Sequence, residues 1–220
     1  MSSNQELKQQ IEYRVLGDTR IRAKNLTVEF QNNRVIIKGT VQSIAARDAA
    51  ESDVWAVKGV KHIENRLQVE FPLGYIKPTD QTLKENLLQQ IALDPDLYQE
   101  NITCEVSDGK VLLQGAVGQL FKKFRATTIA KQTGGATEIK NSIAVVPTRS
   151  IEDRKIAHTI THHLQRVLGE KVNNIALEIE NGHVILNGTV PDLHSFETTE
   201  DITRYTEGVL DIANNMVILS

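Results

Sequence analysis

Apolar and polar residues alternate along residues 26–30, and the same alternation returns at residues 102–106 and 175–179. A period of two places successive side chains on opposite faces of a strand, so that one face is buried and the other lies in solvent. The pattern therefore predicts a half-buried β-strand in each of the three segments. The residues of the buried faces are Leu26, Val28 and Phe30, then Ile102, Cys104 and Val106, then Ile175, Leu177 and Ile179.

A pair of turn-forming residues follows each of these strands. Such pairs accept positive φ, which a two-residue hairpin turn needs. A second apolar run then leads to a glycine at position 39, 115 or 188. We expect three β-hairpins, with a bulge at the glycine or a close approach of its backbone to the next helix. The turn pairs are Asn32-Asn33, Asp108-Gly109 and Asn181-Gly182.

Amphipathic helices precede and follow each hairpin. In the helix before it, apolar residues recur every four positions among polar ones, which predicts one buried stripe. The helix after it begins near positions 43, 119 and 192, where Ser43 and Asp192 are suitable N-caps. We expect this helix to end at a glycine C-cap at position 59, 135 or 208, before a last strand. The stripe of the first helix is Leu7, Ile11 and Val15, then Leu83, Leu87 and Ile91, then Ile156, Ile160 and Leu164.

The three hairpins belong to three copies of one unit. Residues 25–41 return 76 residues later and again after a further 73 residues, and asparagines at positions 65, 141 and 214 keep the same spacing. A repeat in register over about 65 residues is a duplicated domain, because solenoid units are shorter. The order helix, strand, strand, helix, strand predicts an α+β fold with two helices on one face of a three-stranded sheet. We expect three tandem αββαβ domains at residues 1–72, 79–147 and 151–220, joined by short linkers.

The net charge of −3 is distributed unevenly among the copies. Residues 7–71 carry eleven Lys and Arg against eight Asp and Glu, residues 83–147 carry seven against seven, and residues 156–220 carry three against nine. This polarity would favour end-to-end self-association or orientation at an anionic surface, although drift among solvated residues would also produce it. The negative total and the lack of a groove-reading motif argue against nucleic-acid binding.

The single cysteine, Cys104, excludes an intramolecular disulfide and occupies a position that is apolar in the other copies, so we expect a small buried side chain. No window of the sequence approaches the roughly 18 apolar residues of a membrane span. The first residues show neither a secretory signal nor a myristoylation site. We therefore expect a cytoplasmic protein, or a periplasmic one if a leader was removed.

No motif for catalysis is recognisable, whether paired carboxylates, an activated nucleophile or a glycine-rich phosphate loop. We therefore expect neither an enzyme nor a bound cofactor. His158 and His162 lie four positions apart on a predicted helix, a spacing that can chelate a divalent metal. Because only two plausible ligands are present, a solvated helix face is favoured over a metal site.

Large aromatic residues on the second helix lie away from its core stripe. By the helical period of about 3.6 residues they cluster about 120–160° from that stripe. Rings on the outer side of a helix favour contact with another surface. The stripe in the first copy is Ala46, Ala50, Val54 and Val57, and the rings are Trp55, Phe121, Phe124 and Tyr205.

Two of these rings belong to the segment LFKKFR at residues 120–125. Rings with basic neighbours suit the boundary of an anionic membrane, where apolar burial and charge attraction add. Packing of the rings between domains of the same chain is the favoured alternative, because the linkers are short. The hypothesis to be tested is a lipid- or partner-binding site formed by Phe121, Lys122, Lys123, Phe124 and Arg125, with Trp55.

Asp53 departs from the pattern of the repeat. Ile129 and Ile202 take its place in the other copies, where the position belongs to the core stripe. A carboxylate at such a position predicts that the second helix of the first copy packs differently.

The segments VIIKGTV, VLLQGAV and VILNGTV, each followed by a helix, a glycine and an asparagine six residues later, resemble the BON domain family over nearly the whole chain. That family consists of small αββαβ modules of bacterial osmotically inducible, outer-membrane and transport-associated proteins. The resemblance implies a non-enzymatic binding or scaffold protein that engages anionic phospholipid or an envelope-associated protein partner. The alternative that it implies is a cytoplasmic stress-response protein that binds a small cation such as potassium, or acts as an oligomeric scaffold such as a homo-oligomer.

Overall fold

The structure, a computed structural model, describes residues 3–31, 34–60, 62–146, 151–172 and 174–219. Domain 1 contains α1 (Ser3–Gly17), β1 (Lys24–Gln31), β2 (Arg34–Val41), α2 (Ile44–Trp55) and β3 (Ile63–Val69). Domain 2 contains α3 (Asp80–Leu93), β4 (Asn101–Ser107), β5 (Lys110–Val117), α4 (Leu120–Gln132), β6 (Glu138–Asn141) and β7 (Ala144–Val145). Domain 3 contains α5 (Asp153–Leu168), the 3-10 helix η1 (Gly169–Val172), β8 (Ile175–Glu180), β9 (His183–Val190), α6 (Leu193–Tyr205) and β10 (Asp211–Ile218).

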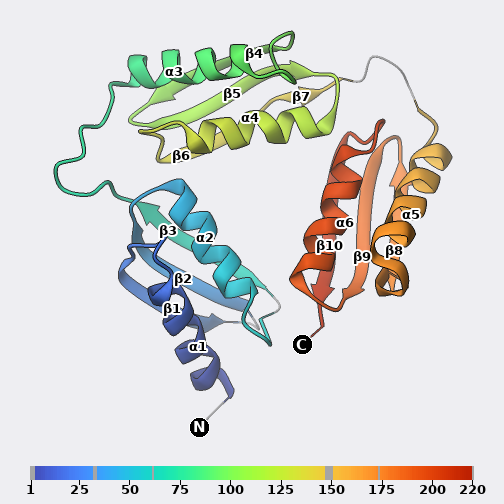
Figure 1. The fold of residues 1–220 in the computed structure, drawn as a ribbon, viewed down its shortest axis with the longest axis horizontal. Coiled ribbons are helices and arrows are strands. Elements are labelled where there is room, and N and C mark those ends of the chain that lie inside the picture. The colour runs from blue at the N-terminus through green and yellow to red at the C-terminus, as the bar shows by residue number, and fades with distance from the viewer. Residues whose placement is uncertain (1–2, 32–33, 61, 147–150, 173, 220) are drawn as a thin grey trace.

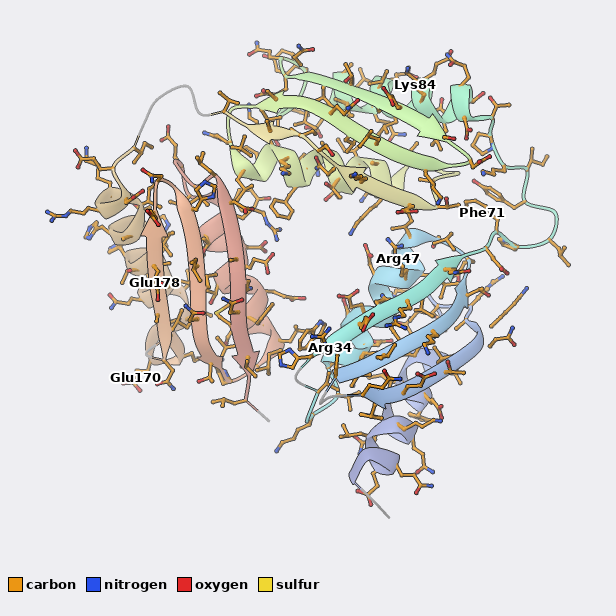
Figure 2. All side chains as sticks on the ribbon, turned by 180° about the vertical axis from the view of Figure 1, so that it is seen from behind. Arg34, Arg47, Phe71, Lys84, Glu170 and Glu178 are labelled. Atoms are coloured by element: carbon orange, nitrogen blue, oxygen red, sulfur yellow. The ribbon has the colours of Figure 1, made fainter. Side chains whose placement is uncertain are left out.

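Each domain has the predicted order helix, strand, strand, helix, strand, so the α+β class is confirmed (Figure 1). The second strand of the hairpin lies in the middle of each sheet. It pairs antiparallel with the first strand and parallel with the last. In domain 2 the last strand is divided into β6 and β7, which both pair with β5. Seen from behind in Figure 2, the sheets of domains 1 and 3 lie in front of their helices.

Each domain is organised around a buried cluster between its helices and its sheet. The stripe predicted for the first helix is buried except for Leu7, which is half-buried, and Ile11, Leu87 and Ile160 have 0% exposure. Cys104 is 2% exposed, as expected of a small core residue. Burial raises the pKa of its thiol, which keeps it protonated and unreactive near neutral pH.

Two of the predicted hairpin turns are confirmed. Asp108 and Gly109 have φ values of 54° and 79°, and Asn181 and Gly182 have 50° and 79°. Positive φ at both central residues is the type I′ geometry that matches the twist of the flanking strands. The turn predicted at residues 32–33 lies outside the described residues.

An aspartate at the start of the first helix holds each of these two turns. The carboxylate of Asp80 accepts hydrogen bonds from the backbone N–H groups of Asp108 and Gly109, at 2.7 and 2.9 Å. Asp153 makes the same pair of bonds to the turn of domain 3, at 2.8 and 2.9 Å. The hairpin tip is therefore fixed to the N-terminus of the first helix.

The glycine at the end of the second strand approaches the first strand rather than the following helix, so that part of the prediction is wrong. A side chain at Gly115 or Gly188 would clash with the backbone carbonyl oxygen of Asn101 or Asn174. The alternative expectation, a bulge, holds in domain 1. There the register of β1 and β2 shifts opposite Gly39.

The helix starts agree with prediction, but the helix ends do not. The side chains of Ser43 and Asp192 accept hydrogen bonds from the backbone N–H groups of Ala46 and Ser195, at 3.1 and 2.7 Å. The Ser195 hydroxyl and N–H hold the pKa of Asp192 at about 2. The second helices end three to four residues before the predicted glycine caps, at Trp55, Gln132 and Tyr205.

The displaced glycines occupy a tight turn after the helix, with φ between +95° and +103°. At Gly135 a side chain would clash with the ring of Pro78, and at Gly208 it would lie 2.9 Å from Ile156 Cδ1. In domains 2 and 3 the turn passes so close to Pro78 and Ile156 that a side chain does not fit, whereas at Gly59 the nearest atom is Leu7 Cδ2 at 3.5 Å and the positive φ alone favours glycine.

Candidate functional site at the junction of the second helices

The three second helices face one another at the centre of the molecule. Figure 1 shows α2, α4 and α6 on the inner sides of their domains and α1, α3 and α5 towards the periphery. Helix α4 contacts both α2 and α6. The surface on which the sequence placed its candidate site is therefore largely a junction between domains.

The aromatic residues predicted on the outer side of these helices pack across this junction. Phe121 stacks on Tyr205 of domain 3, with ring centroids 5.2 Å apart. The guanidinium of Arg204 lies 4.0 Å above the centre of the Phe124 ring, a cation–π contact. These contacts agree with the favoured alternative of packing between domains. Phe124 remains 37% exposed, so part of its ring can still meet a ligand.

The first residue of a second helix is inserted into the neighbouring domain at two of the junctions. Ile44 is 1% exposed and belongs to the buried cluster of domain 2, although it starts helix α2. Leu120, at the equivalent position of α4, is 3% exposed and belongs to the cluster of domain 3. Leu193, the equivalent residue of α6, is only half-buried. Domains 2 and 3 therefore each have a core that the preceding domain completes.

The basic residues of the segment LFKKFR differ in their partners. Lys122 forms an ion pair with Glu100 of its own domain. Arg125 donates from Nε to Asp94 Oδ2 at 2.9 Å, and this hydrogen bond raises the pKa of the guanidinium. Among the residues that the structure describes, Lys123 has no acidic group within ion-pair distance. Lys123 is thus the basic side chain of this segment with a charge left for a ligand, and a ligand role for the segment stays a prediction.

A polar cleft of about 520 Å³ lies beside Trp55, where domains 1 and 3 meet. The indole ring stacks on Phe196 of α6, with centroids 6.0 Å apart. Lys131 of α4 reaches the cleft and pairs with Asp48 of α2, with 2.7 Å between Nζ and Oδ2. Side chains of all three domains therefore line this space.

The repeated asparagine connects the last strand to the second helix, a role that its spacing did not reveal. Asn141 donates to the Lys123 carbonyl at 2.8 Å and to the Thr127 hydroxyl at 2.7 Å, and its oxygen accepts from Ile143 N–H at 2.9 Å. Asn65 and Asn214 make corresponding bonds in the other domains. The asparagine thus serves the fold rather than a ligand.

The histidine pair lies on the solvent face of α5. His158 and His162 are exposed, and their ring centroids are 6.2 Å apart. Within the described ranges, no three His, Cys, Asp or Glu side chains are grouped closely enough to hold a metal ion. Over the same ranges, no helix has both the length and the apolar character to cross a membrane.

Sequence analysis missed an apolar turn in the linker between domains 1 and 2. Leu73 is 102% exposed and Ile76 is 92% exposed, the largest exposures among the big apolar side chains of the described residues. The linker lies at the outer rim of the molecule (Figure 1). The helical and strand periods do not apply to a linker, but two aliphatic residues outside any predicted element are a sequence signal of an exposed apolar contact.

Comparison with known proteins gives a clear family match. The family model of the BON domain matches residues 3–70, 79–147 and 152–220. Osmotically-inducible protein Y of Escherichia coli (strain K12) is 25% identical over 126 residues, which cover 56% of this chain and 63% of that protein. The match thus spans less than two thirds of that relative.

Two further similarities complete the comparison. A protein of Anaplasma centrale described as "Uncharacterized protein in gshII 5'region" is 28% identical over 131 residues, which cover 56% of this chain and 87% of that protein. Among solved structures, the C-terminal domain of CdsD, a structural protein of the type III secretion system of Chlamydia trachomatis, aligns over 98% of both chains. Its identity is 14% and its TM-score is 0.27.

Proposed function

The chain belongs to the BON domain family, and from that premise we propose that it is a non-enzymatic binding protein that engages anionic phospholipid. The primary contact is the linker turn, residues 72–77. The second helices hold the three domains together and leave this turn free at the rim. Lys123 and the exposed part of Phe124 form a secondary contact.

The exposure of Leu73 and Ile76 is the observation that carries the proposal. The turn is ordered, because the backbone N–H of Tyr75 donates to the Pro72 carbonyl at 3.0 Å. The ring of Tyr75 stacks on Phe71, with centroids 4.6 Å apart. Figure 2 shows Phe71 at the edge of domain 1, where the linker leaves it. The two aliphatic side chains are thus presented on a supported loop.

The energies fit reversible attachment to a membrane surface. Burial of one large aliphatic side chain contributes roughly 1.5–3 kcal/mol. A basic residue at an anionic surface, here Lys77, contributes about 1 kcal/mol. The total of about 4–7 kcal/mol corresponds to dissociation constants from roughly millimolar to 10 μM. Tyr75 suits the headgroup level, where an aromatic ring with a polar tip is favoured.

The charge distribution supports the same orientation. Domain 1, which ends at this turn, carries eleven basic against eight acidic residues over positions 7–71. Domain 3 carries three against nine over positions 156–220 and would be repelled by the same surface. The relative's name, osmotically-inducible protein Y, adds the proposal that this function is required under osmotic stress.

Vesicle flotation tests the proposal. The wild-type chain should float with phosphatidylglycerol vesicles at low salt, much less at high salt, and not with neutral phosphatidylcholine vesicles. Leu73→Ser combined with Ile76→Ser should reduce flotation at least tenfold, whereas Lys123→Glu should reduce it by a smaller factor. Leu93→Ser is the matched control, because Leu93 is 75% exposed on α3 away from the turn.

Two results would contradict the proposal. Equal flotation of the Leu73 and Ile76 double variant and the wild type would remove the linker turn as the contact. Absence of flotation with every vesicle at every salt concentration would remove phospholipid as the ligand. A protein partner or a scaffold role would then take its place.

A further inference from the structure

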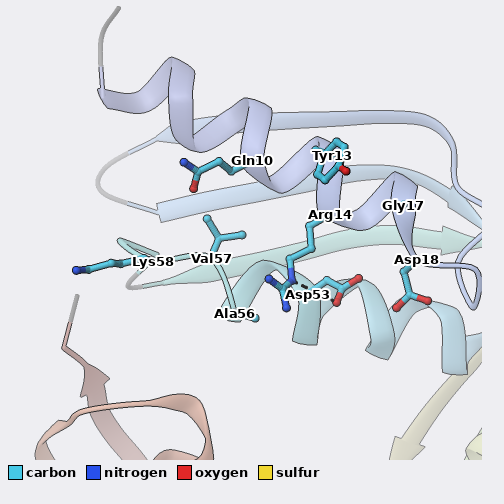
Figure 3. Close-up of a pocket in the computed structure, with 9 residues that line it drawn as sticks. All are labelled: Gln10, Tyr13, Arg14, Gly17, Asp18, Asp53, Ala56, Val57 and Lys58. Atoms are coloured by element: carbon cyan, nitrogen blue, oxygen red, sulfur yellow. Dashed lines mark ion pairs between the residues drawn. The ribbon is translucent and has the colours of Figure 1, made fainter.

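A cleft of about 540 Å³ lies between α1 and the C-terminal end of α2 in domain 1. Figure 3 shows Arg14 and Asp53 facing each other across it, with Asp18 beside them. Ala56 and Val57 form an apolar part of its wall, and Tyr13 lies at its rim. A buried carboxyl group, a half-exposed guanidinium and an apolar wall therefore line one open space.

Asp53 is the unusual member of this set. The residue is only 9% exposed, and its Oδ2 is buried without a hydrogen-bond partner among the described residues. Its Oδ1 lies 3.7 Å from Arg14 Nε, which is too long for a hydrogen bond. A buried carboxyl oxygen is unfavourable without a donor. A bound molecule can supply that donor, and so can a proton shared with the neighbouring carboxyl group of Asp18, whose hydrogen bond with Asp53 helps to raise the pKa of Asp53.

The fold itself does not need a carboxyl group here. Ile129 and Ile202 occupy the equivalent positions of domains 2 and 3, in helices of the same kind. Asp53 nevertheless leaves the packing of α2 intact, because Ala50 and Val54 around it are 0% exposed. The difference predicted between the packing of α2 and that of the other second helices is therefore confined to the side chain of Asp53.

The charged residues beside Asp53 leave Arg14 available to a bound molecule. Asp18 is neutralised by Arg20, with 2.9 Å between Nε and Oδ2. The Arg14 side chain is 52% exposed, and among the residues that the structure describes its charged partner is Asp53, at 3.7 Å. Arg14 can therefore turn towards a bound anion without breaking a hydrogen bond, and Asp53 can then accept from a bound cation.

We propose that this cleft binds a free α-amino acid, with its ammonium group on Asp53 and its carboxylate on Arg14. The two groups of such a ligand are attached to the same carbon atom, which matches an acid and a guanidinium that lie side by side. The ammonium supplies the donors that Asp53 lacks, and the carboxylate can accept two parallel N–H bonds from Arg14. The ligand side chain would pack on Val57. This site is independent of the linker turn and of phospholipid.

Thermal shift and titration calorimetry of the full chain test the site. Each of the common L-amino acids is supplied at about 10 mM, together with its N-acetyl and amide derivatives, since a ligand of the folded state raises Tm in proportion to its occupancy. We expect a saturable shift with one or more free amino acids. Derivatives that lack the ammonium or the carboxylate should bind at least tenfold more weakly.

Three variants locate the binding. Asp53→Ile restores the residue of the other domains and should fold but lose the shift. Arg14→Gln should also lose it and keeps the test valid if the first variant is unstable. Asp96→Asn, an exposed aspartate of domain 2, should bind like the wild type. No shift with any free amino acid, equal binding of the blocked derivatives, or unchanged binding by both cleft variants would overturn the proposal.

Discussion

The indole ring of Trp55 stacks on the ring of Phe196 and joins domain 1 to domain 3, with ring centroids 6.0 Å apart. At the two other junctions an apolar residue at the start of a second helix is buried in the core of the next domain. Here the corresponding Leu193 is only half-buried. The junction between the first and the last domain therefore depends on an aromatic contact rather than on a shared core.

Phe196→Ala should loosen this junction without unfolding the domains. An aromatic pair contributes about 0.5–1.5 kcal/mol beyond the area that it buries. The chain has one tryptophan, so fluorescence excited at wavelengths that tyrosine does not absorb reports on Trp55 alone. We expect a red-shifted emission and a larger radius of gyration in small-angle scattering, with an unchanged far-UV spectrum. Tyr98→Ala is the control, and equal scattering of Phe196→Ala and the wild type would contradict the expectation.

Ile44→Ala should destabilise domain 2, although Ile44 belongs to domain 1. A large-to-small change at a fully buried aliphatic residue costs about 2–5 kcal/mol. Hydrogen exchange measured by mass spectrometry should therefore quicken in α3, α4 and β5 more than in α1 and β2. Leu193→Ala is the matched control, because it is equivalent in position but half-buried. Faster exchange confined to domain 1 would show that Ile44 does not complete the core of domain 2.

Asn141→Ala should lower the free energy of unfolding by about 1–3 kcal/mol, because it leaves partly buried polar groups without their hydrogen bonds. The side chain donates to Lys123 O and Thr127 Oγ1 and accepts from Ile143 N–H. Urea denaturation measures the change. Asn215→Ala is the control, since Asn215 is exposed and contacts only Asn187 among the bonds of its side chain that the structure describes. Equal stability of the two variants would show that the repeated asparagine is not structural.

The hairpins, the helix stripes and the caps at Ser43 and Asp192 could be predicted because each depends on residues close in sequence. The roles of Gly115 and Gly135 could not, because the atoms that exclude a side chain there belong to Asn101 and Pro78. The sequence around Ile44 predicts only the start of a helix. Its burial in another domain depends on how the domains pack against each other. The periodicity of apolar residues identifies a buried face but not the segment or domain that covers it.

The candidate site shows the same limit. The helical period predicts the outward direction of Trp55 and Phe121 and favours packing between domains as the alternative to ligand binding. The partners Phe196 and Tyr205 could not be chosen from the sequence, since several surfaces could have covered the rings. Asp53 was recognisable as an exception, because the repeat supplied Ile129 and Ile202 for comparison.

Gly188→Ala should destabilise domain 3 by more than about 1 kcal/mol, because alanine is strained at positive φ. Gly188 has φ +124°, and a side chain there would clash with the Asn174 carbonyl oxygen. Gly17→Ala is the matched control, because a side chain at Gly17 meets nothing within 4 Å. The control should be neutral or stabilising by up to about 1 kcal/mol. Thermal unfolding measures the Tm of both variants. Equal Tm values for Gly188→Ala and Gly17→Ala would show that alanine is not strained at position 188.

The pH dependence of stability should distinguish Asp53 from Asp18. Burial and the negative charge of Asp18 raise the pKa of Asp53 above its ordinary value of 3.8, against the opposing effect of Arg14. The folded state therefore binds this proton more tightly than the unfolded state does. The stability that Asp53 contributes is present below about pH 4 and is lost as the pH rises through its folded pKa.

Asp18 has the opposite sign, because its hydrogen bonds with Arg20 lower its pKa to about 2. Its contribution is present above about pH 4 and is lost as the pH falls through about 2. Urea denaturation from about pH 3 to pH 7 should therefore show that the free energy of unfolding of Asp53→Asn rises relative to that of the wild type as the pH rises. Above the folded pKa of Asp53 the difference between the two should stay constant. The free energy of unfolding of Asp18→Asn should fall relative to that of the wild type as the pH rises over the same range. If Asp53→Asn and the wild type keep a constant difference throughout, Asp53 titrates alike in the folded and unfolded chains, and its burial has no effect on its proton.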